Sequence, residues 1–218
     1  MCGRFTLTSD PPAIYAEFGL NPPADWHPRY NIAPTQPVLA VIESAEGLRV
    51  GRLSWGLVPY WSKDRADAHK RINARAESLL EKPSFRDAFA RRRCLILADG
   101  FFEWTRLGSR RQPMLIRRPD GRPFAFAGLW DRWKPPAGEP LYTCTIVTTD
   151  ANPTVRPIHD RMPVILGTRE RALWLDREST PDQLQAMLQP STMEFEVVPV
   201  SPLVNSPAND GPEVLRPL

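Results

Sequence analysis

One stretch of this chain is apolar on both of the faces that a strand presents. Residues 93–104 read RCLILADGFFEW, with few polar side chains to point into solvent. A strand buried on both faces lies inside a sheet that is covered above and below. We therefore predict one central strand over 93–104, in which period-two alternation puts Glu103 on the face of Leu95, Leu97 and Phe101. A carboxylate in such surroundings requires a partner or a function.

The remaining pattern indicates many short strands and few helices. The 25 prolines are spread through the 218 residues, as is typical of turns between short strands. Strands are predicted over 38–42, 48–55, 114–117, 124–129, 141–148, 164–166 and 195–200, and helices over 11–18, 84–90, 168–175 and 181–188. The expected fold class is α+β, one strand-rich domain over 1–218 with a partly closed, barrel-like sheet flanked by short helices. Residues 201–212 have no regular pattern and are either a lid over a site or a tail.

The cysteines and the charge narrow the class of protein. Cys2, Cys94 and Cys144 are an odd number without CxxC spacing, which argues against a disulfide framework and a zinc site. We expect no metal and no cofactor. No apolar run is long enough to span a bilayer, and no secretory signal is recognisable, so the expected location is cytoplasmic, with nucleoid association. The net charge of +3 is mild, but much of the positive charge is arginine in clusters, whose planar fork suits phosphate.

The start of the chain, MCGRF, carries a candidate nucleophile. If Met1 is removed, Cys2 presents a thiol and a free α-amine on adjacent carbons. The amine has a reference pKa of about 7.7–8.0, so a useful fraction is neutral at cellular pH. It can condense with an aldehyde to a Schiff base, which the thiol then closes to a five-membered thiazolidine; the thiol, near pKa 8.5, needs only modest help to ionise. The alternative is an ordinary buried cysteine.

Three further side chains are candidates, each with a structural alternative. His159 lies between Ile158 and Asp160, where neighbouring charges can hold and tune an imidazole; the alternative is a hydrogen-bonded structural histidine. The case for Asn73 as a functional residue is weaker, because the side chains of most loop asparagines hydrogen-bond to their own backbone. Glu103 is favoured by its apolar strand. His27 and His69 occur in polar stretches and are expected to be exposed.

Together these residues fall in a series of ordered blocks that resembles a known family. The blocks are MCGRF, RYNIAP (29–34), WGLVPYW (55–61), INARAES (72–78), ADGFFEW (98–104), VTTDAN (147–152), IHDRMP (158–163) and VSPLVNSPAND (200–210). The chain is similar over essentially its full length to the SOS-response-associated peptidase-like (SRAP) proteins, which shield abasic sites in single-stranded DNA. The resemblance implies the SRAP fold, self-removal of Met1 and a covalent thiazolidine crosslink between Cys2 and the aldehyde of an abasic site.

The resemblance also implies roles for residues of the matched blocks. Glu103 matches the acid/base glutamate, His159 the active-site histidine and Asn73 the asparagine that orients the terminal cysteine. DNA contacts are implied for phosphate-binding, pocket-lining and base-stacking positions, namely Arg4, Asn31, Pro34, Trp61, Arg75, Thr148 and Arg161. Some relatives carry a tryptophan pair at this point, whereas this chain has Trp61-Ser62 preceded by Tyr60. The aromatic wedge that stacks on a base beside the lesion is therefore either Trp61 or Tyr60. The expected partner is abasic single-stranded DNA, including junctions, bound by a monomer.

Two other functions remain open from the sequence. An N-terminal-nucleophile hydrolase such as a glutamine amidotransferase also starts with Cys-Gly and uses the terminal amine as a base, although nothing here resembles its glutamine-binding blocks. A non-catalytic reader of single-stranded or modified DNA would use the arginines and tryptophans equally well. It would leave Cys2, Glu103 and His159 without a role.

Overall fold

The computed structural model of the chain describes residues 2–218, so the expected removal of Met1 lies outside the described residues. The strands are β1 Phe5–Leu7, β2 Arg29–Ile32, β3 Pro37–Ser44, β4 Gly47–Trp55, β5 Asn73–Arg75, β6 Arg93–Ala98, β7 Gly100–Leu107, β8 Arg110–Arg117, β9 Phe124–Trp133, β10 Leu141–Asp150, β11 Arg161–Pro163, β12 Ile165–Leu166 and β13 Glu196–Pro199. The α-helices are α1 Pro11–Phe18, α2 Pro83–Arg91, α3 Thr168–Leu175 and α4 Pro181–Ala186. Short 3₁₀ turns are η1 Ala68–Arg71, η2 Ala76–Ser78, η3 Pro202–Asn205 and η4 Pro212–Leu215.

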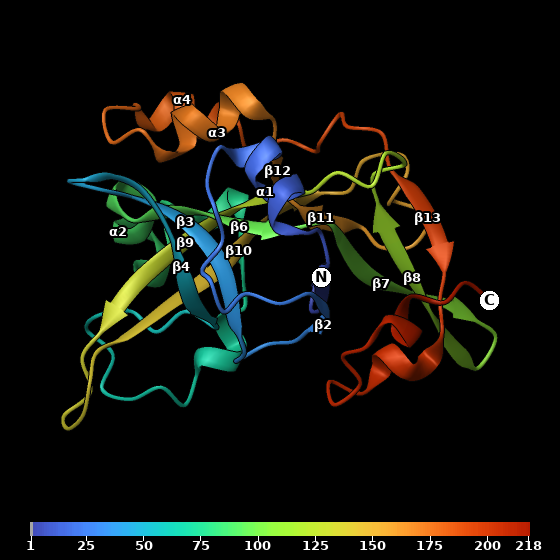
Figure 1. Cartoon of the computed structure of the whole chain (residues 1–218). Coiled ribbons are helices and arrows are strands. Elements are labelled where there is room, and N and C mark those ends of the chain that lie inside the picture. The colour runs from blue at the N-terminus through green and yellow to red at the C-terminus, as the bar shows by residue number, and fades with distance from the viewer. Residues whose placement is uncertain (1) are drawn as a thin grey trace.

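Within residues 2–218 the strands form two sheets. The smaller has the order β13-β8-β7-β1-β2, and the larger the order β11-β10-β4-β3-β6-β9-β12, with β5 added beside β10. Because β9 also pairs with β10, the strands β10-β4-β3-β6-β9 close into a ring. Figure 1 shows the two sheets side by side, with α3 and α4 above the larger one. The predicted fold class, α+β with a partly closed sheet flanked by short helices, is confirmed.

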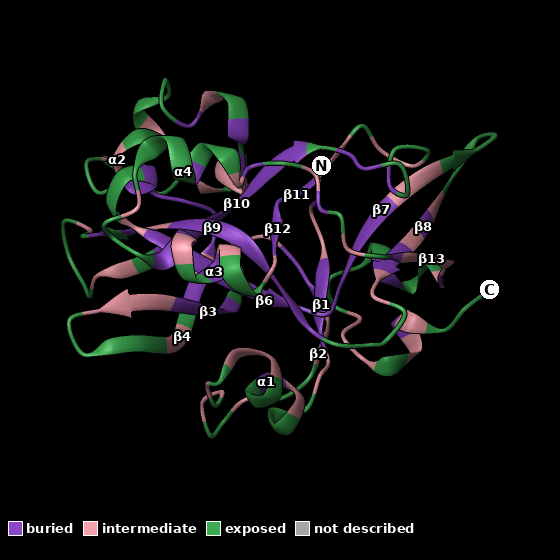
Figure 2. Cartoon of the chain, turned by 90° about the horizontal axis from the view of Figure 1, so that it is seen from above, coloured by how far each residue is buried: buried purple, intermediate pink, exposed green. Residues whose placement is uncertain are grey.

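Strand β1 joins the two sheets through a shared aromatic core. It belongs to the smaller sheet, but the Phe5 ring lies 5.2 Å from the Trp55 ring of β4 and 5.6 Å from the Phe126 ring of β9. Phe101 of β7 reaches the same Phe126 ring at 6.2 Å. These four side chains are fully buried, and Figure 2 shows β1 buried between the strands of the two sheets. The start of the chain is therefore held inside the protein.

The predicted single strand over 93–104 is wrong. The chain forms two strands, β6 in the larger sheet and β7 in the smaller, separated by Asp99. Glu103 therefore does not share a sheet face with Leu95 and Leu97. It does lie on the same face of β7 as Phe101, two residues earlier. An apolar run on both faces is equally compatible with one buried strand or with two that lie in different sheets, so periodicity alone cannot separate the two.

Other boundaries differ less from the prediction. The four helices occur where they were expected, and α1 begins at an Asp10 cap and ends at Gly19 in the left-handed conformation. The predicted strand over 164–166 corresponds to β12, which pairs with β9. Strand β11, which lies just before it and pairs with β10, was not predicted. Residues 201–212 are a packed segment rather than a free tail: Asp210 accepts hydrogen bonds from the backbone N–H groups of Tyr30 and Asn31.

The turn between β6 and β7 is stabilised by the buried carboxylate of Asp99. This carboxylate accepts hydrogen bonds from the hydroxyl of Thr6 and from the backbone N–H and hydroxyl groups of both Thr8 and Ser9. The backbone N–H of Asp99 donates in turn to the Thr6 carbonyl at 2.9 Å. A charged acceptor shared by so many donors fixes the chain that follows β1 to the start of β7.

We predict that Asp99→Ala lowers the free energy of unfolding by about 3 kcal/mol, because the buried Thr6 hydroxyl and the half-buried donors of Thr8 and Ser9 lose their shared charged acceptor. The control Glu178→Ala removes an exposed carboxylate and should change it by no more than about 0.5 kcal/mol. Urea unfolding followed by circular dichroism measures both. Equal stability of the two variants would mean that water replaces Asp99.

Candidate functional site

Cys2 lies where the two sheets meet. The antiparallel pairing of Phe5 with Phe101 runs the segment before β1 alongside β7, and the N–H of Phe102 donates to the Arg4 carbonyl at 2.9 Å. From the larger sheet, the side-chain amide of Asn73 donates to the Cys2 carbonyl at 2.8 Å. Asn73 is placed there because β5 pairs in parallel with the centre of β10. The Cys2 backbone is therefore fixed from both sides.

Glu103 projects from β7 into the same region. Its side chain is buried, and that burial raises the pKa of Glu103 to about 7, with the negative charge of Asp160 contributing in the same direction. The charge of Glu103 in turn contributes to the raised pKa of Cys2. A carboxyl group with a pKa near 7 exchanges its proton readily at cellular pH, as a general acid or base requires.

The thiol of Cys2 is fully buried. Desolvation by this burial raises the pKa of Cys2 far above its ordinary value, and the thiol contacts the Arg4 carbonyl with an S···O distance of 3.7 Å. The expectation from the sequence that modest help would ionise the thiol is therefore wrong for the described chain. The reason is that an apolar interior disfavours the thiolate more than the neutral thiol.

His159 lies in the loop between β10 and β11. Its Nδ1 accepts a hydrogen bond from the backbone N–H of Arg161 at 2.9 Å, and the Asp160 carboxylate also lies 2.9 Å from Nδ1. Partial burial lowers the pKa of His159. A neutral imidazole accepts at one ring nitrogen and donates from the other, and so can pass a proton in either direction. The charge of Asp160 acts on Glu103, so this loop and β7 are electrostatically linked.

Two of the predicted DNA-contacting residues hold the C-terminal segment. Arg4 Nη1 donates to the Asn31 side-chain oxygen at 2.8 Å and to the Val204 carbonyl at 2.6 Å. Asn31 is fully buried, and its amide donates to the carbonyls of Val204, Ser206 and Asn209. Since Arg4 is two residues from Cys2, these contacts connect residues 204–209 to the site.

The other predicted DNA contacts differ in their access to solvent. Arg75 is exposed and Pro34 is half-buried, whereas Thr148 is fully buried, and its hydroxyl has no hydrogen-bond partner among residues 2–218. Trp61 is 50% exposed and Tyr60 54%. Tyr60 is also fixed in place: its N–H donates to the buried Asp131 carboxylate at 2.9 Å, and the Arg92 guanidinium lies over its ring.

Arg161 is only slightly exposed and already has anionic partners. Its guanidinium donates to the carboxylates of Glu77 and Asp150 and to the Thr148 carbonyl. Sequence reasoning missed Glu77 and Asp150 as partners of Arg161. Glu77 and Asp150 lie inside the matched blocks INARAES and VTTDAN, but only the tertiary structure brings them to one guanidinium.

Two absences hold for the described part of the chain. No three His, Cys, Asp or Glu side chains within residues 2–218 gather as metal ligands would. Over the same range, no helix combines the length and the apolar character needed to cross a membrane.

Comparisons with known proteins agree over the whole chain. The model of the family described as "SOS response associated peptidase (SRAP)" matches residues 1–207. The abasic site processing protein YoqW of Bacillus subtilis is 48% identical over 99% of both chains. The abasic site processing protein HMCES of Gallus gallus is 37% identical over 76% of this chain and 56% of its own. A crystal structure of a Bacteroides thetaiotaomicron protein superposes with a TM-score of 0.88 at 27% identity, covering 100% of both chains.

The chain is thus matched by a family model through most of its length, by curated relatives at high identity and by a solved structure with the same fold. Its overall fold is that of the solved structure. The protein belongs to the SOS response associated peptidase family.

Proposed function

We propose that this protein processes abasic sites in single-stranded DNA by forming a covalent thiazolidine between Cys2 and the ring-opened sugar, after removal of Met1. The observation that carries the proposal is the hydrogen bond from Asn73 to the Cys2 carbonyl beside a glutamate whose burial raises its pKa to about 7. Relatives that carry the name abasic site processing protein support the substrate class.

The raised pKa of Cys2 indicates the order of the chemical steps. Because burial keeps the thiol protonated, the amine attacks first. It adds to the C1′ aldehyde, and one water leaves as the imine forms. The sulfur then adds to the imine carbon while the thiol proton moves to the nitrogen. The product is a neutral five-membered ring, so no buried thiolate has to persist.

Glu103 and His159 supply the proton transfers in this proposal. A protonated Glu103 donates to the leaving hydroxyl during imine formation, for which a pKa of about 7 is well matched. His159, kept neutral by its lowered pKa, exchanges a proton with the sugar hydroxyl. Asn73 orients the Cys2 backbone so that amine and thiol face the same carbon. Self-removal of Met1 would use the same groups.

Strand binding in this proposal combines stacking and phosphate contacts. The exposed Trp61 or Tyr60 stacks on a base beside the lesion, and exposed Arg75 takes a phosphate. Such binding tolerates any sequence and weakens with salt. Arg4, Asn31, Pro34, Thr148 and Arg161 complete the proposed strand site. Arg4 and Asn31 also hold the C-terminal segment.

A non-catalytic DNA reader is the second candidate, favoured only by the exposed aromatic and basic side chains. It predicts binding without a covalent product. A denaturing gel with abasic single-stranded DNA separates the two functions, because only the crosslinking protein gives a retarded band that survives the denaturant.

We predict that Cys2→Ala abolishes the crosslink and keeps non-covalent affinity for the abasic strand within about threefold, because stacking and phosphate contacts remain. Intact mass should show wild type without Met1 and, after reaction, the mass of that chain plus the oligonucleotide minus one water. The control Cys94→Ala removes another fully buried thiol and should still crosslink. Crosslinking by Cys2→Ala would refute the proposal.

We predict that Glu103→Gln forms the crosslink roughly a hundredfold more slowly. Glu103 has a pKa of about 7, so the wild-type rate should fall above pH 7 as its proton is lost. The Gln variant cannot lose that proton, and its rate should keep rising with pH as the amine becomes neutral. Quenched single-turnover reactions between pH 5.5 and 9 measure both. A decline above pH 7 that survives in Glu103→Gln would assign that titration to another group.

A further inference from the structure

The two terminal nitrogens of the Arg161 guanidinium have all their hydrogens bonded in the described chain, whereas its buried Nε has no hydrogen-bond partner among residues 2–218. Nη1 donates to Glu77 Oε1 at 2.7 Å and to Asp150 Oδ1 at 2.8 Å. Nη2 donates to Glu77 Oε2 at 3.0 Å and to the Thr148 carbonyl at 2.7 Å. These four bonds use all the hydrogens of the two terminal nitrogens. A DNA phosphate can therefore reach Arg161 bidentately only by replacing an acceptor already present.

The Glu77 carboxylate resembles a bound phosphate in its geometry. It contacts both terminal nitrogens of Arg161 with its two oxygens, which is the fork arrangement that guanidinium groups form with carboxylates and phosphates alike. The hydrogen bond from Arg161 lowers the pKa of Glu77, so this carboxylate stays ionised at cellular pH. Asp150 adds a second negative charge at Nη1.

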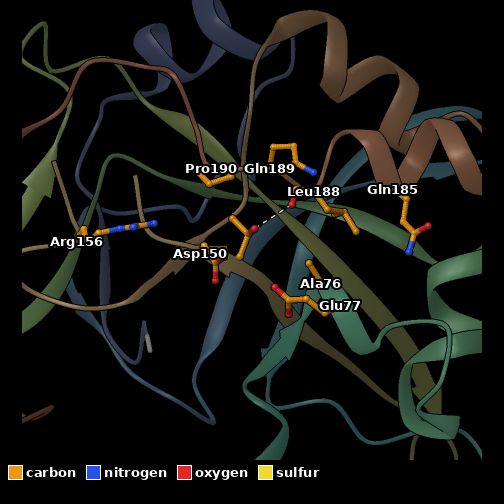
Figure 3. Close-up of a pocket in the computed structure, with 9 residues that line it drawn as sticks. Ala76, Glu77, Asp150, Arg156, Gln185, Leu188, Gln189 and Pro190 are labelled. Carbon is orange, nitrogen blue, oxygen red and sulfur yellow. Dashed lines mark hydrogen bonds between the residues drawn. The ribbon is translucent and has the colours of Figure 1, made fainter. Parts of the chain in front are cut away.

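The partners of Arg161 differ from it in their freedom to move. The Arg161 side chain is only 13% exposed, whereas the side chains of Glu77 and Asp150 are 57% and 69% exposed. Both carboxylates line an open pocket of about 570 Å³ between β10, η2 and the segment that follows α4. Figure 3 shows the two carboxylates turned toward each other at one side of this pocket. They have space to swing away, while the guanidinium is held in place.

We infer that Glu77 and Asp150 are specificity-determining residues of the DNA site, because they occupy Arg161 in place of a strand phosphate. This inference rests on the proposed function. When an undamaged strand binds, Arg161 exchanges a carboxylate for a phosphate, so the strand gains little binding free energy from this contact. A strand held by Cys2 stays long enough to displace the carboxylates and take the contact.

The test compares E77Q/D150N with wild type and with E46Q/E178Q, a control that removes the same two charges at exposed positions outside the pocket. Fluorescence anisotropy measures binding of an undamaged single-stranded oligonucleotide over a range of salt concentrations. E77Q/D150N should bind about fivefold more tightly than the control, because one partly exposed ion pair between Arg161 and a phosphate contributes about that factor in affinity. Its slope of log K against log salt should steepen by about 0.7, the value for one added phosphate contact on a single strand.

Adding Arg161→Gln identifies the group responsible. If the carboxylates act through Arg161, E77Q/D150N/R161Q should lose both the added affinity and the added slope. The single variant D150N keeps the two bonds that Arg161 donates to Glu77 and should show a smaller gain. It serves as the test where the double variant fails to fold. Equal affinity and slope for E77Q/D150N and the control would overturn the inference, as would a gain that survives Arg161→Gln.

The readout also separates this inference from the proposed function. The undamaged oligonucleotide carries no aldehyde, so its binding does not depend on crosslinking. Wild type that crosslinks abasic DNA while E77Q/D150N behaves as the control leaves the function intact and refutes the role of the carboxylates. Steeper salt dependence in E77Q/D150N without any crosslink by wild type supports the carboxylates and refutes the function.

Discussion

The position of strand β1 between the two sheets is the constraint on which the rest of the structure depends. Its backbone pairs with β2 and β7, its Phe5 side chain packs into the larger sheet, and Asp99 fastens the residues that follow it. Chain ends usually fray at a protein surface. Here the chain from Cys2 onward is instead fixed against the core, so Cys2 has a defined orientation toward groups on both sheets.

Burial then sets the chemistry of that position. The interior raises the pKa of Cys2, and the same desolvation raises the pKa of Glu103 to about 7. For the proposed reaction the two effects are complementary: the thiol would remain neutral until an imine is available, and the carboxyl group could hold a proton at cellular pH. An exposed cysteine and glutamate of the same sequence would have neither property. The loop that carries His159 also acts on this region, because the charge of its residue Asp160 contributes to the raised pKa of Glu103.

Anionic side chains also shape the surface where a strand would bind. Arg161 is balanced by two carboxylates and a carbonyl, whereas Arg75 and the aromatic rings of Tyr60 and Trp61 face solvent. Buried Asp131 orders Tyr60 through its backbone, and Arg92 stacks on its ring. If the proposed function holds, such a site would present stacking surfaces before its full positive charge, which would suit recognition of a damaged strand rather than of any polyanion.

The sequence by itself determined the fold class, the four helices, most strands and the family, because caps, turn residues and ordered motifs are local signals. It also identified Cys2, Asn73, Glu103 and His159 as candidates. Only the tertiary structure decided that residues 93–104 divide between two sheets at Asp99, that the thiol pKa rises rather than falls, and that Glu77 and Asp150 meet at Arg161. Strand pairing, desolvation and ion pairing depend on residues far apart in the chain, and no local pattern encodes which of them come into contact.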